Sequence, residues 1–265
     1  MIRVAIIGSG NVAYHLAKCL HGKQQVSVES IWVRNPEKED LFNTYTYRIC
    51  NEIHTLPDAD IYVLAVSDSS IASVCAQLPF ENKIVIHTSG ATHIDAISSK
   101  QHGGVFYPLQ SFSIGRVIDY NKITVLLETA NESDKPILEK LASAFSNRFA
   151  WVSSEERVKY HLAATLVNNF SNHFYTLSEL FLHKNKLRFD LLKPLILETA
   201  EKVQHLSPKL AQTGPAKRLD LPTLERHLSL IEDVDLRHLY EIMTKSIRKI
   251  HEDLNSEKMV KNEEL

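Results

Sequence analysis

The chain has 265 residues, of which 44% are hydrophobic, and its 30 Lys and Arg residues nearly balance its 32 Asp and Glu residues, which leaves a formal net charge of −2. This length allows one large domain or two ordinary ones. A near-neutral chain lacks the basic surface that attracts nucleic acids and anionic membranes, so neither is expected as a partner.

The three cysteines, Cys19, Cys50 and Cys75, are an odd number without a CxxC spacing. They support neither a disulfide framework nor a structural zinc site, and no metal site is predicted. No apolar run approaches the ~18 residues that a membrane span needs. We therefore expect a cytoplasmic protein with reduced thiols.

Up to about Val152, short β-rich runs alternate with helical periodicity, which is typical of a parallel sheet with covering helices. The expected strands are Arg3–Ile7, Val28–Val33, Ile61–Val66, Ile84–His87, Gly104–Phe106, Thr124–Glu128 and Arg148–Val152. The expected helices are Val12–Leu20, Ser70–Ala76, Ile94–Ser99 and Asp134–Phe145. The sequence thus predicts an α/β fold whose first domain, residues 1–152, is a doubly wound parallel sheet.

From Ser153 onward, helical patterns follow one another and no strand is expected. The expected helices are Glu155 to about His183, Phe189 to about Leu206, Leu221–Ile231 and Leu236–Leu254. We predict an all-helical C-terminal domain over residues 153–257, followed by a flexible tail at 258–265. Since no linker separates the two domains, we expect them to pack closely, with a cleft between them.

A glycine motif follows the first expected strand directly and opens the first expected helix. It consists of Gly8, Ser9, Gly10, Asn11, Val12 and Ala13, in the pattern G-x-G-x-x-A. Gly8 permits a tight turn, Gly10 lets the backbone approach a pyrophosphate, and Ala13 lets the helix pack closely on the strand. The alternative is a tight turn without a ligand. The strand-loop-helix context favours a dinucleotide site and a Rossmann-type sheet.

The second expected strand ends at Arg34, 21 positions after Ala13, where an NAD site would carry a carboxylate. A guanidinium there can pair with the 2′-phosphate of NADP(H), with Asn35 and Lys38 as further contacts. The alternatives are an exposed turn arginine, or an NAD site that uses Glu29 inside the strand. We expect NADP(H) as the cofactor.

Two more strand ends carry small or polar residues, where ligands of such sheets collect. Val66 and Ser67 end one strand, and Asp68 after them either faces the ligand or caps the next helix. Ser89 and Gly90 end the next strand, where they either lie close to the nicotinamide or form an ordinary turn. We assign Val66, Ser67 and Gly90 to the cofactor and Ser89 to the reaction.

The long helix after Glu155 is apolar on most sides and is therefore expected to be buried. His161, Thr165, Asn168 and Asn172 interrupt it at offsets that keep them within a strip of about 60°. They form either a catalytic set, with His161 as the acid and Asn168 as an orienting group, or a satisfied polar seam. We assign Thr165 and Asn172 to the substrate.

A further polar cluster lies around Gly214 and Pro215. Arg218 either pairs with Asp220 or binds a substrate carboxylate. Asp220 precedes Leu221 and Pro222 and has the position of a helix N-cap, so its alternative role is structural.

Several strings together resemble a known family. They are the glycine motif, Ile86–Ala91, Tyr107–Phe112, Tyr160–Ala164 with Asn168 and Asn169, and Thr213–Pro215 with Arg218, Asp220 and His227. The chain resembles Rossmann-like NADP-binding proteins with a helical C-terminal domain of uncharacterised function, similar in layout to pyrroline-5-carboxylate reductase and to 6-phosphogluconate and β-hydroxyacid dehydrogenases. The resemblance implies NADP(H) and a homodimer through the helical domain. We also assign Gln110 to the substrate site.

The chain departs from these relatives at two places. β-Hydroxyacid dehydrogenases carry a lysine three or four residues before an asparagine of the long helix, where this chain has Thr165 and Ala164 before Asn168. Lysine-assisted alcohol oxidation is therefore not expected. Members of the resembled family also often have histidine at the position of Tyr107, which weakens any role given to this position.

The sequence leaves two hypotheses. In the leading one, the protein is an NADP(H)-dependent oxidoreductase that moves a hydride between the nicotinamide and a small carbonyl or imine substrate in the cleft between the domains. In the alternative, it is a non-catalytic NADP(H)-binding sensor or scaffold, and the polar strip of the long helix is structural.

Overall fold

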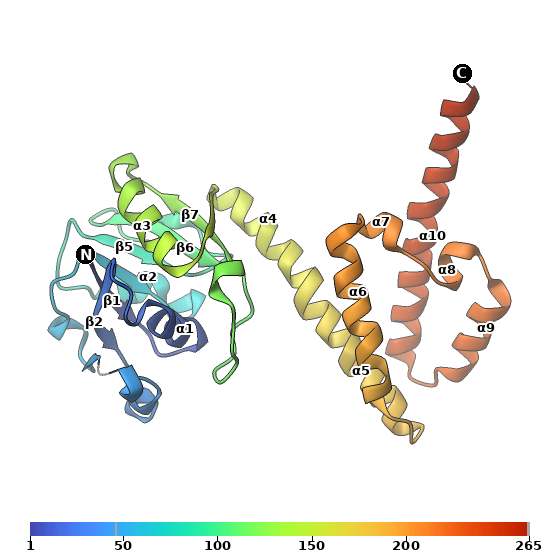
Figure 1. Cartoon of the computed structure of the whole chain (residues 1–265), viewed down its shortest axis with the longest axis horizontal. Coiled ribbons are helices and arrows are strands. Elements are labelled where there is room, and N and C mark those ends of the chain that lie inside the picture. The colour runs from blue at the N-terminus through green and yellow to red at the C-terminus, as the bar shows by residue number, and fades with distance from the viewer. Residues whose placement is uncertain (46, 264–265) are drawn as a thin grey trace. The chain divides into compact units, whose positions relative to one another are not determined.

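The structure is a computed structural model that describes residues 1–45 and 47–263, with side chains up to residue 252. It separates into two compact units, Met1–Ser171 and Asn172–Leu265 (Figure 1). The predicted domain boundary after residue 152 stays a prediction. Of the predicted flexible tail, residues 258–263 belong to the last helix, whereas its side chains and residues 264 and 265 lie outside the described part.

An eight-stranded sheet forms the centre of the first unit. Its strands are β1 (Ile2–Ile7), β2 (Val26–Trp32), β3 (Arg48–Cys50), β4 (Ile61–Leu64), β5 (Ile84–His87), β6 (His102–Pro108), β7 (Thr124–Thr129) and β8 (Arg148–Trp151). They lie in the order β3-β2-β1-β4-β5-β6-β7-β8. The predicted α/β fold is thus confirmed, and the connection from β3 to β4 crosses back to the far side of β1, as in doubly wound sheets.

The sheet differs from the prediction in two details. β6 and β7 pair antiparallel, while all other neighbouring strands pair parallel. β3, a three-residue strand at the edge, was not predicted, because it is too short to carry a pattern. The sheet is therefore mixed and mostly parallel.

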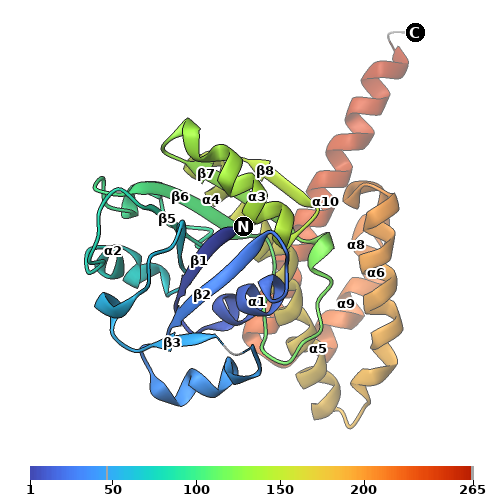
Figure 2. The ribbon, with the colours of Figure 1, turned by 60° about the vertical axis from the view of Figure 1, so that its left-hand side comes forward.

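Helices cover both faces of the sheet (Figure 2). On one face, α1 (Asn11–Leu20) and α3 (Lys135–Phe145) bury their apolar side chains against alternate residues of the strands. On the other face, α2 (Ile71–Cys75) packs on a smaller core that includes Tyr62 and Leu64. This alternation brings the ends of β1, β4 and β5 to one edge, which is where the glycine motif lies.

Helical structure continues from residue 154 without a further strand in the described residues, which confirms the all-helical C-terminal region. The helices are α4 (Ser154–Ala164), the π-helical segment η8 (Thr165–Phe170), α5 (Ser171–Lys184), α6 (Lys193–His205), α7 (Pro208–Ala211), α8 (Pro215–Arg218), α9 (Leu221–Leu230) and α10 (Val234–Glu263). Across the described residues, no helix combines the length and apolar character that a bilayer crossing requires.

Short 3-10 helices connect the longer elements. They are η1 (Pro36–Leu41), η2 (Asn43–Tyr45), η3 (Ile53–Thr55), η4 (Asp68–Ser70), η5 (Ile94–Ala96), η6 (Tyr120–Lys122), η7 (Glu132–Asp134) and η9 (Phe189–Leu192). The helix expected at Ile94–Ser99 is only the single turn η5.

The long helix is less buried than its composition predicts. Leu162 is 63% exposed and Val167 is 75% exposed in the single chain. A helix that is apolar on most sides needs a cover on most sides, and one chain leaves part of this surface open to solvent.

Candidate functional site

The turn after β1 brings the chain very close to the end of β4. Gly8 has a φ of +133°, and a Cβ at this position would lie 2.2 Å from the backbone oxygen of Ala65. Any other residue would be strained at this φ and would place its Cβ against the backbone of Ala65, so this position requires glycine. Gly8 thus fixes the path of the loop that leads into α1.

Gly10 is the N-cap of α1 and leaves the start of this helix open. It provides no side-chain cap, the first turn carries no acidic residue, and nothing lies within 4 Å of the position where a Cβ would stand. The first backbone N–H groups therefore face open space with the positive end of the helix dipole. Ala13, one turn later, is fully buried in the core.

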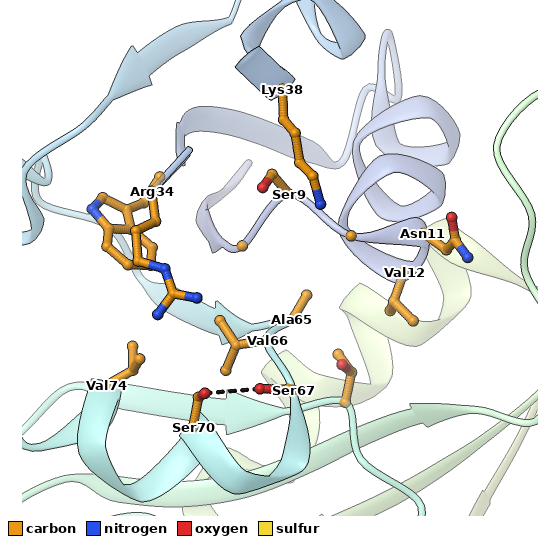
Figure 3. Close-up of a pocket in the computed structure, with 14 residues that line it drawn as sticks. Ser9, Asn11, Val12, Arg34, Lys38, Ala65, Val66, Ser67, Ser70 and Val74 are labelled. Atoms are coloured by element: carbon orange, nitrogen blue, oxygen red, sulfur yellow. Dashed lines mark hydrogen bonds between the residues drawn. The ribbon is translucent and has the colours of Figure 1, made fainter. Parts of the chain in front are cut away.

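A pocket of about 370 Å³ opens in front of this helix start, and we refer to it as the glycine-loop pocket (Figure 3). Its lining comes from the ends of β1, β2, β4 and β5. The lining residues are Gly8, Ser9, Gly10, Asn11, Val12, Trp32, Arg34, Lys38, Ala65, Val66, Ser67, Ser70, Val74 and Thr88. Nine of the twelve sequence-predicted cofactor residues thus lie in this lining, among them the cations Arg34 and Lys38.

Arg34 and Lys38 supply the positive charge of the glycine-loop pocket. Arg34 lies just beyond the end of β2 and Lys38 lies on η1, and both side chains extend into the pocket (Figure 3). No acidic side chain is among the described residues that line it. Backbone N–H groups, a helix N-terminus and two cations fit the phosphates of NADP(H).

Asn35 lies at the start of η1, outside the lining of the glycine-loop pocket. Its side chain accepts a hydrogen bond from the backbone N–H of Glu37 at 3.2 Å and so caps η1. Its contribution is to begin the helix that carries Lys38.

The end of β4 adds polar groups to the same pocket. The hydroxyl groups of Ser67 and Ser70 lie 2.8 Å apart, as the dashed line in Figure 3 marks. Asp68, between them, makes no capping hydrogen bond at η4 or α2, so the structure does not favour its alternative role as a cap.

At the end of β5, a buried histidine is followed by a tight turn. His87 Nδ1 accepts the N–H of Ser89 at 3.2 Å, and its Nε2 lacks a partner among the described residues. Burial, with the nearby charge of Arg157, lowers the pKa of His87 to about 4. The Ser89 hydroxyl bonds Thr92 and accepts the N–H groups of Ala91 and Thr92, which is the ordinary turn that the sequence left as an alternative.

Gly90 lies against two aromatic rings from distant parts of the chain. A Cβ on Gly90 would stand 2.5 Å from Nδ1 of His161 on α4 and 2.7 Å from Cζ of Tyr107 on β6. The Tyr107 hydroxyl and His161 Nδ1 are 3.1 Å apart, within hydrogen-bonding distance. The absent side chain of Gly90 therefore makes room for this pair of rings.

Tyr107 and His161 open onto a second pocket, of about 580 Å³, which we call the tyrosine-histidine pocket. It also contains Gln110, Thr165 and Asn168, so four sequence-predicted residues meet here. The complete lining is Tyr107, Leu109, Gln110, Ser111, Tyr160, His161, Ala163, Ala164, Thr165, Val167, Asn168 and Asn169. No Asp, Glu, Lys or Arg is among these described residues.

The polar strip of the long helix does not follow the predicted geometry. Thr165 to Phe170 form the π-helical segment η8, in which the rotation per residue is smaller than the 100° of an α-helix. The Thr165 hydroxyl donates to the backbone oxygen of His161 at 3.1 Å. Asn172 does not line the pocket and belongs to the second unit.

The sequence reasoning missed a buried ion pair that holds the start of α4. Arg157 is only 1% exposed, and its guanidinium contacts the carboxylate of Glu128 on β7 and donates to the backbone oxygen of Thr92. Ser154 also donates to Glu128, at 2.8 Å. Arg157 lies four residues before His161, so this network ties the helix that carries His161 to the turn after β5.

The remaining predicted substrate residues lie in the second unit. Asp220 caps α9, since its carboxylate accepts the backbone N–H of Thr223 at 3.2 Å and the Thr223 hydroxyl at 2.8 Å. These hydrogen bonds, with the charge of Arg218 adding to them, lower the pKa of Asp220. The structural alternative for Asp220 therefore has direct support, while Arg218 is exposed.

Comparison with known families assigns both parts of the chain. Residues 3–90 match the family described as NADP oxidoreductase coenzyme F420-dependent, and residues 123–247 match a domain of unknown function, DUF2520. No curated protein matches the sequence.

Solved structures with the same fold cover nearly the whole chain. A Bacteroides fragilis protein described as a candidate NADP oxidoreductase is 34% identical, with 94% of this chain and 98% of that chain covered and a TM-score of 0.85. A Thermotoga maritima protein is 21% identical, with 94% and 99% covered and a TM-score of 0.77. The 1-pyrroline-5-carboxylate reductase of Streptococcus pyogenes is 13% identical, with 94% and 98% covered and a TM-score of 0.60, which shows a shared fold.

The identity to the Bacteroides fragilis protein extends over both parts of the molecule, and the two family matches follow one another in the same order as the sheet and the helices. The chain therefore belongs to the family of proteins in which a Rossmann domain of the NADP oxidoreductase type is followed by a helical DUF2520 domain.

Proposed function

We propose that the protein is an NADP(H)-dependent oxidoreductase that transfers a hydride between the nicotinamide and a small carbonyl or imine substrate. The observation that carries this proposal is the glycine-loop pocket, in which an uncapped helix N-terminus faces the same space as Arg34 and Lys38. The family match over residues 3–90 and the description of the Bacteroides fragilis relative support it.

The pyrophosphate of the cofactor is assigned to the start of α1. Ser9, Gly10 and Asn11 offer backbone N–H groups there, beside Val12. Arg34 and Lys38 are assigned to the 2′-phosphate, because a guanidinium and an ammonium group neutralise a dianion where an NAD site would have a carboxylate. Bound NADPH supplies the hydride.

Val66 and Ser67 continue the proposed path of the cofactor toward the end of β5. Thr88 lines the glycine-loop pocket, and Gly90, two residues later, lies against the Tyr107 and His161 rings of the second pocket. This continuity supports a nicotinamide position close to Gly90. Ser89 keeps its hydroxyl within the turn, so its proposed part is to hold Gly90 in place.

The substrate is assigned to the tyrosine-histidine pocket. There, His161 supplies or orients a proton, while Asn168, Thr165 and Gln110 offer hydrogen bonds to the reacting group. Asn172 and Arg218 remain proposed substrate contacts from the helical unit, Arg218 for a substrate anion.

A homodimer through the helical domain is part of the proposal. Leu191 is 70% exposed and Leu195 is 62% exposed, and they stand four residues apart on successive helical turns. Contiguous exposed apolar side chains of this kind are typical of protein interfaces. Sedimentation of the wild type and of a Leu191→Lys, Leu195→Lys variant tests the dimer, and a monomeric wild type contradicts it.

The experiment for the catalytic function is a titration of NADPH and NADH, followed by a panel of small ketones and cyclic imines with NADPH consumption as the readout. We expect tighter binding of NADPH and turnover of at least one compound. Equal affinity for both cofactors would contradict the NADP assignment. Tight NADPH binding without turnover, together with cofactor-dependent capture of a protein, would favour the sensor or scaffold hypothesis.

A further inference from the structure

We infer that Tyr107 is the residue that gives the proton to the substrate and that His161 acts through it, as the group that restores this proton. The inference rests on the proposed function, because it concerns the same reaction. The inference goes beyond the proposed function, because it assigns proton donation to the Tyr107 phenol and not to the His161 imidazole. From the sequence alone, Tyr107 had no assigned role in the reaction.

The position of Tyr107 between the two pockets is the first argument. The glycine-loop pocket ends at Thr88, and the backbone of Gly90 contacts Tyr107 and His161. Asp68, which directly follows the pocket residue Ser67, is close enough to Tyr107 to affect its titration. Tyr107 thus lies where the proposed hydride source and the tyrosine-histidine pocket meet.

The state of the Tyr107 hydroxyl is the second argument. Burial, with the negative charge of Asp68 adding to it, raises the pKa of Tyr107 above its usual value of 10. The side chain is therefore a neutral phenol at neutral pH, and since burial disfavours the phenolate, it can donate its proton only if a neighbouring group replaces that proton. A proton donor must reach the reacting atom and be protonated when it does so, and Tyr107 meets both requirements at the lining of the pocket.

The contact with His161 is the third argument. The two rings are 5.9 Å apart at 67°, in an edge-to-face arrangement, and His161 Nδ1 points at the Tyr107 hydroxyl from 3.1 Å. Among the described residues, Tyr107 is the side chain that lies within hydrogen-bonding distance of this imidazole. When Nδ1 carries a proton and donates it to the Tyr107 oxygen, the hydroxyl hydrogen of Tyr107 is free to point into the pocket.

With these roles, every proton and electron pair of a reduction is accounted for. The substrate carbon gains the hydride, and the electron pair of the C=O or C=N π bond moves to the oxygen or nitrogen. This atom takes the proton of the Tyr107 hydroxyl, Nδ1–H of His161 replaces that proton, and Nε2 of His161 takes up a proton from solvent. The products are the alcohol or amine and NADP⁺, and proton exchange with solvent restores the Nδ1–H form of His161.

The test compares Tyr107→Phe and His161→Gln with Tyr240→Phe. Tyr240 is a matched control, because its hydroxyl lies 2.8 Å from Nδ1 of His227 and the rings are 5.9 Å apart, in the same kind of pair within the helical unit. All proteins are assayed as full chains, with NADPH and the ketone and imine panel. The ¹⁵N chemical shifts of the histidine rings are recorded without substrate.

We expect Tyr107→Phe to lower the rate of hydride transfer by about 100-fold or more at unchanged NADPH affinity, and His161→Gln to lower it less. Tyr107→Phe shifts the Nδ1 signal of His161, whereas Tyr240→Phe shifts only that of His227 and leaves the rate unchanged. If Tyr107→Phe keeps the wild-type rate, or if the Nδ1 signal of His161 does not move in this variant, the inference is wrong while the proposed function stands. A wild type without turnover overturns the proposed function as well.

Discussion

The hydroxyl of Tyr107 lies 3.1 Å from Nδ1 of His161, although the two residues are 54 positions apart in the chain. β6 carries the tyrosine, α4 carries the histidine, and Gly90 at the end of β5 leaves the space in which they meet. Three segments therefore have to keep their positions for one hydrogen bond. Substitutions can show which residues hold the Tyr107–His161 pair in place and what the pair contributes to the reaction.

Gly8 and Gly10 are expected to respond differently to substitution by alanine. Gly8→Ala places a Cβ 2.2 Å from a backbone oxygen at a φ of +133°, so the free energy of unfolding should fall by about 3 kcal/mol or more. Gly10→Ala meets nothing within 4 Å, so stability should be kept while NADPH affinity falls about tenfold. Urea unfolding and NADPH titration separate the two effects, and equal behaviour of both variants would contradict this assignment.

Gly90→Ala is expected to reduce turnover far more than it weakens NADPH binding. Its Cβ would stand 2.5 Å from His161 Nδ1, so the two rings must move apart. A displacement of this kind costs on the order of 100-fold in rate. Turnover at the wild-type rate, measured beside an unchanged cofactor affinity, would show that the arrangement of these rings does not matter for the reaction.

Reversal of the charge at Arg34 should remove the preference for NADPH. Arg34→Glu places a carboxylate beside the proposed 2′-phosphate, and we expect about 10- to 100-fold weaker NADPH binding with little change for NADH. Arg48→Glu on β3, an exposed arginine outside the pocket lining, is the matched control. A fluorescence titration gives the four affinities, and a parallel loss of both cofactors in Arg34→Glu speaks against a 2′-phosphate contact.

The glycine motif and the sheet could be predicted because their patterns are local. A strand, a glycine loop and an amphipathic helix follow one another within 20 residues, and Gly8, Gly10 and Arg34 lie where these patterns place them. The antiparallel pairing of β7 could not be predicted, because strand direction depends on the path of the connection from β6 and not on the residues of the strand.

The Tyr107 contact and the Arg157 network could not be predicted for a different reason. Both join residues that are distant in the sequence, and neither pair has a spacing that a pattern could reveal. The π-helical turn of η8 also changes the angular positions that a regular helix assigns to Asn168 and Asn172. His161, Thr165 and Asn168 nevertheless share a pocket, although only His161 lies on the regular helix α4 and the other two lie on η8.

Loss of the buried Arg157 is expected to destabilise the first unit strongly. Arg157→Met leaves Glu128 without its guanidinium partner, and removal of one member of a buried pair costs about 3–5 kcal/mol. Arg148→Met, at an exposed arginine on β8, should change stability by less than about 0.5 kcal/mol. Urea unfolding of both variants is the measurement, and similar unfolding midpoints would show that the pair contributes little.

His87 should make the protein less stable as the pH falls below neutrality. Its pKa in the folded protein is about 4, against an ordinary value of 6.5, so between these values the unfolded chain binds a proton that the native state does not. Stability is then full above pH 6.5 and declines toward pH 4, with a loss of about 2–3 kcal/mol at pH 4.5 from this residue.

The measurement is urea unfolding at pH 7 and pH 4.5 for the wild type and for His87→Gln. The variant keeps a polar side chain that does not titrate, so the difference in stability between the two pH values should be smaller than in the wild type. The same pH dependence in both proteins would mean that His87 is not the group that resists protonation in the folded state.

The proposed transfer of a hydride from NADPH to a small substrate can be followed directly with an isotope. The wild type is incubated with NADPH that carries deuterium at both C4 positions of the nicotinamide, together with the ketone and imine panel, and the products are analysed by mass spectrometry. We predict one deuterium per molecule of alcohol or amine formed, with about 100-fold less product from Tyr107→Phe at matched times. Tight NADPH binding without deuterium transfer to any compound of the panel would contradict the account.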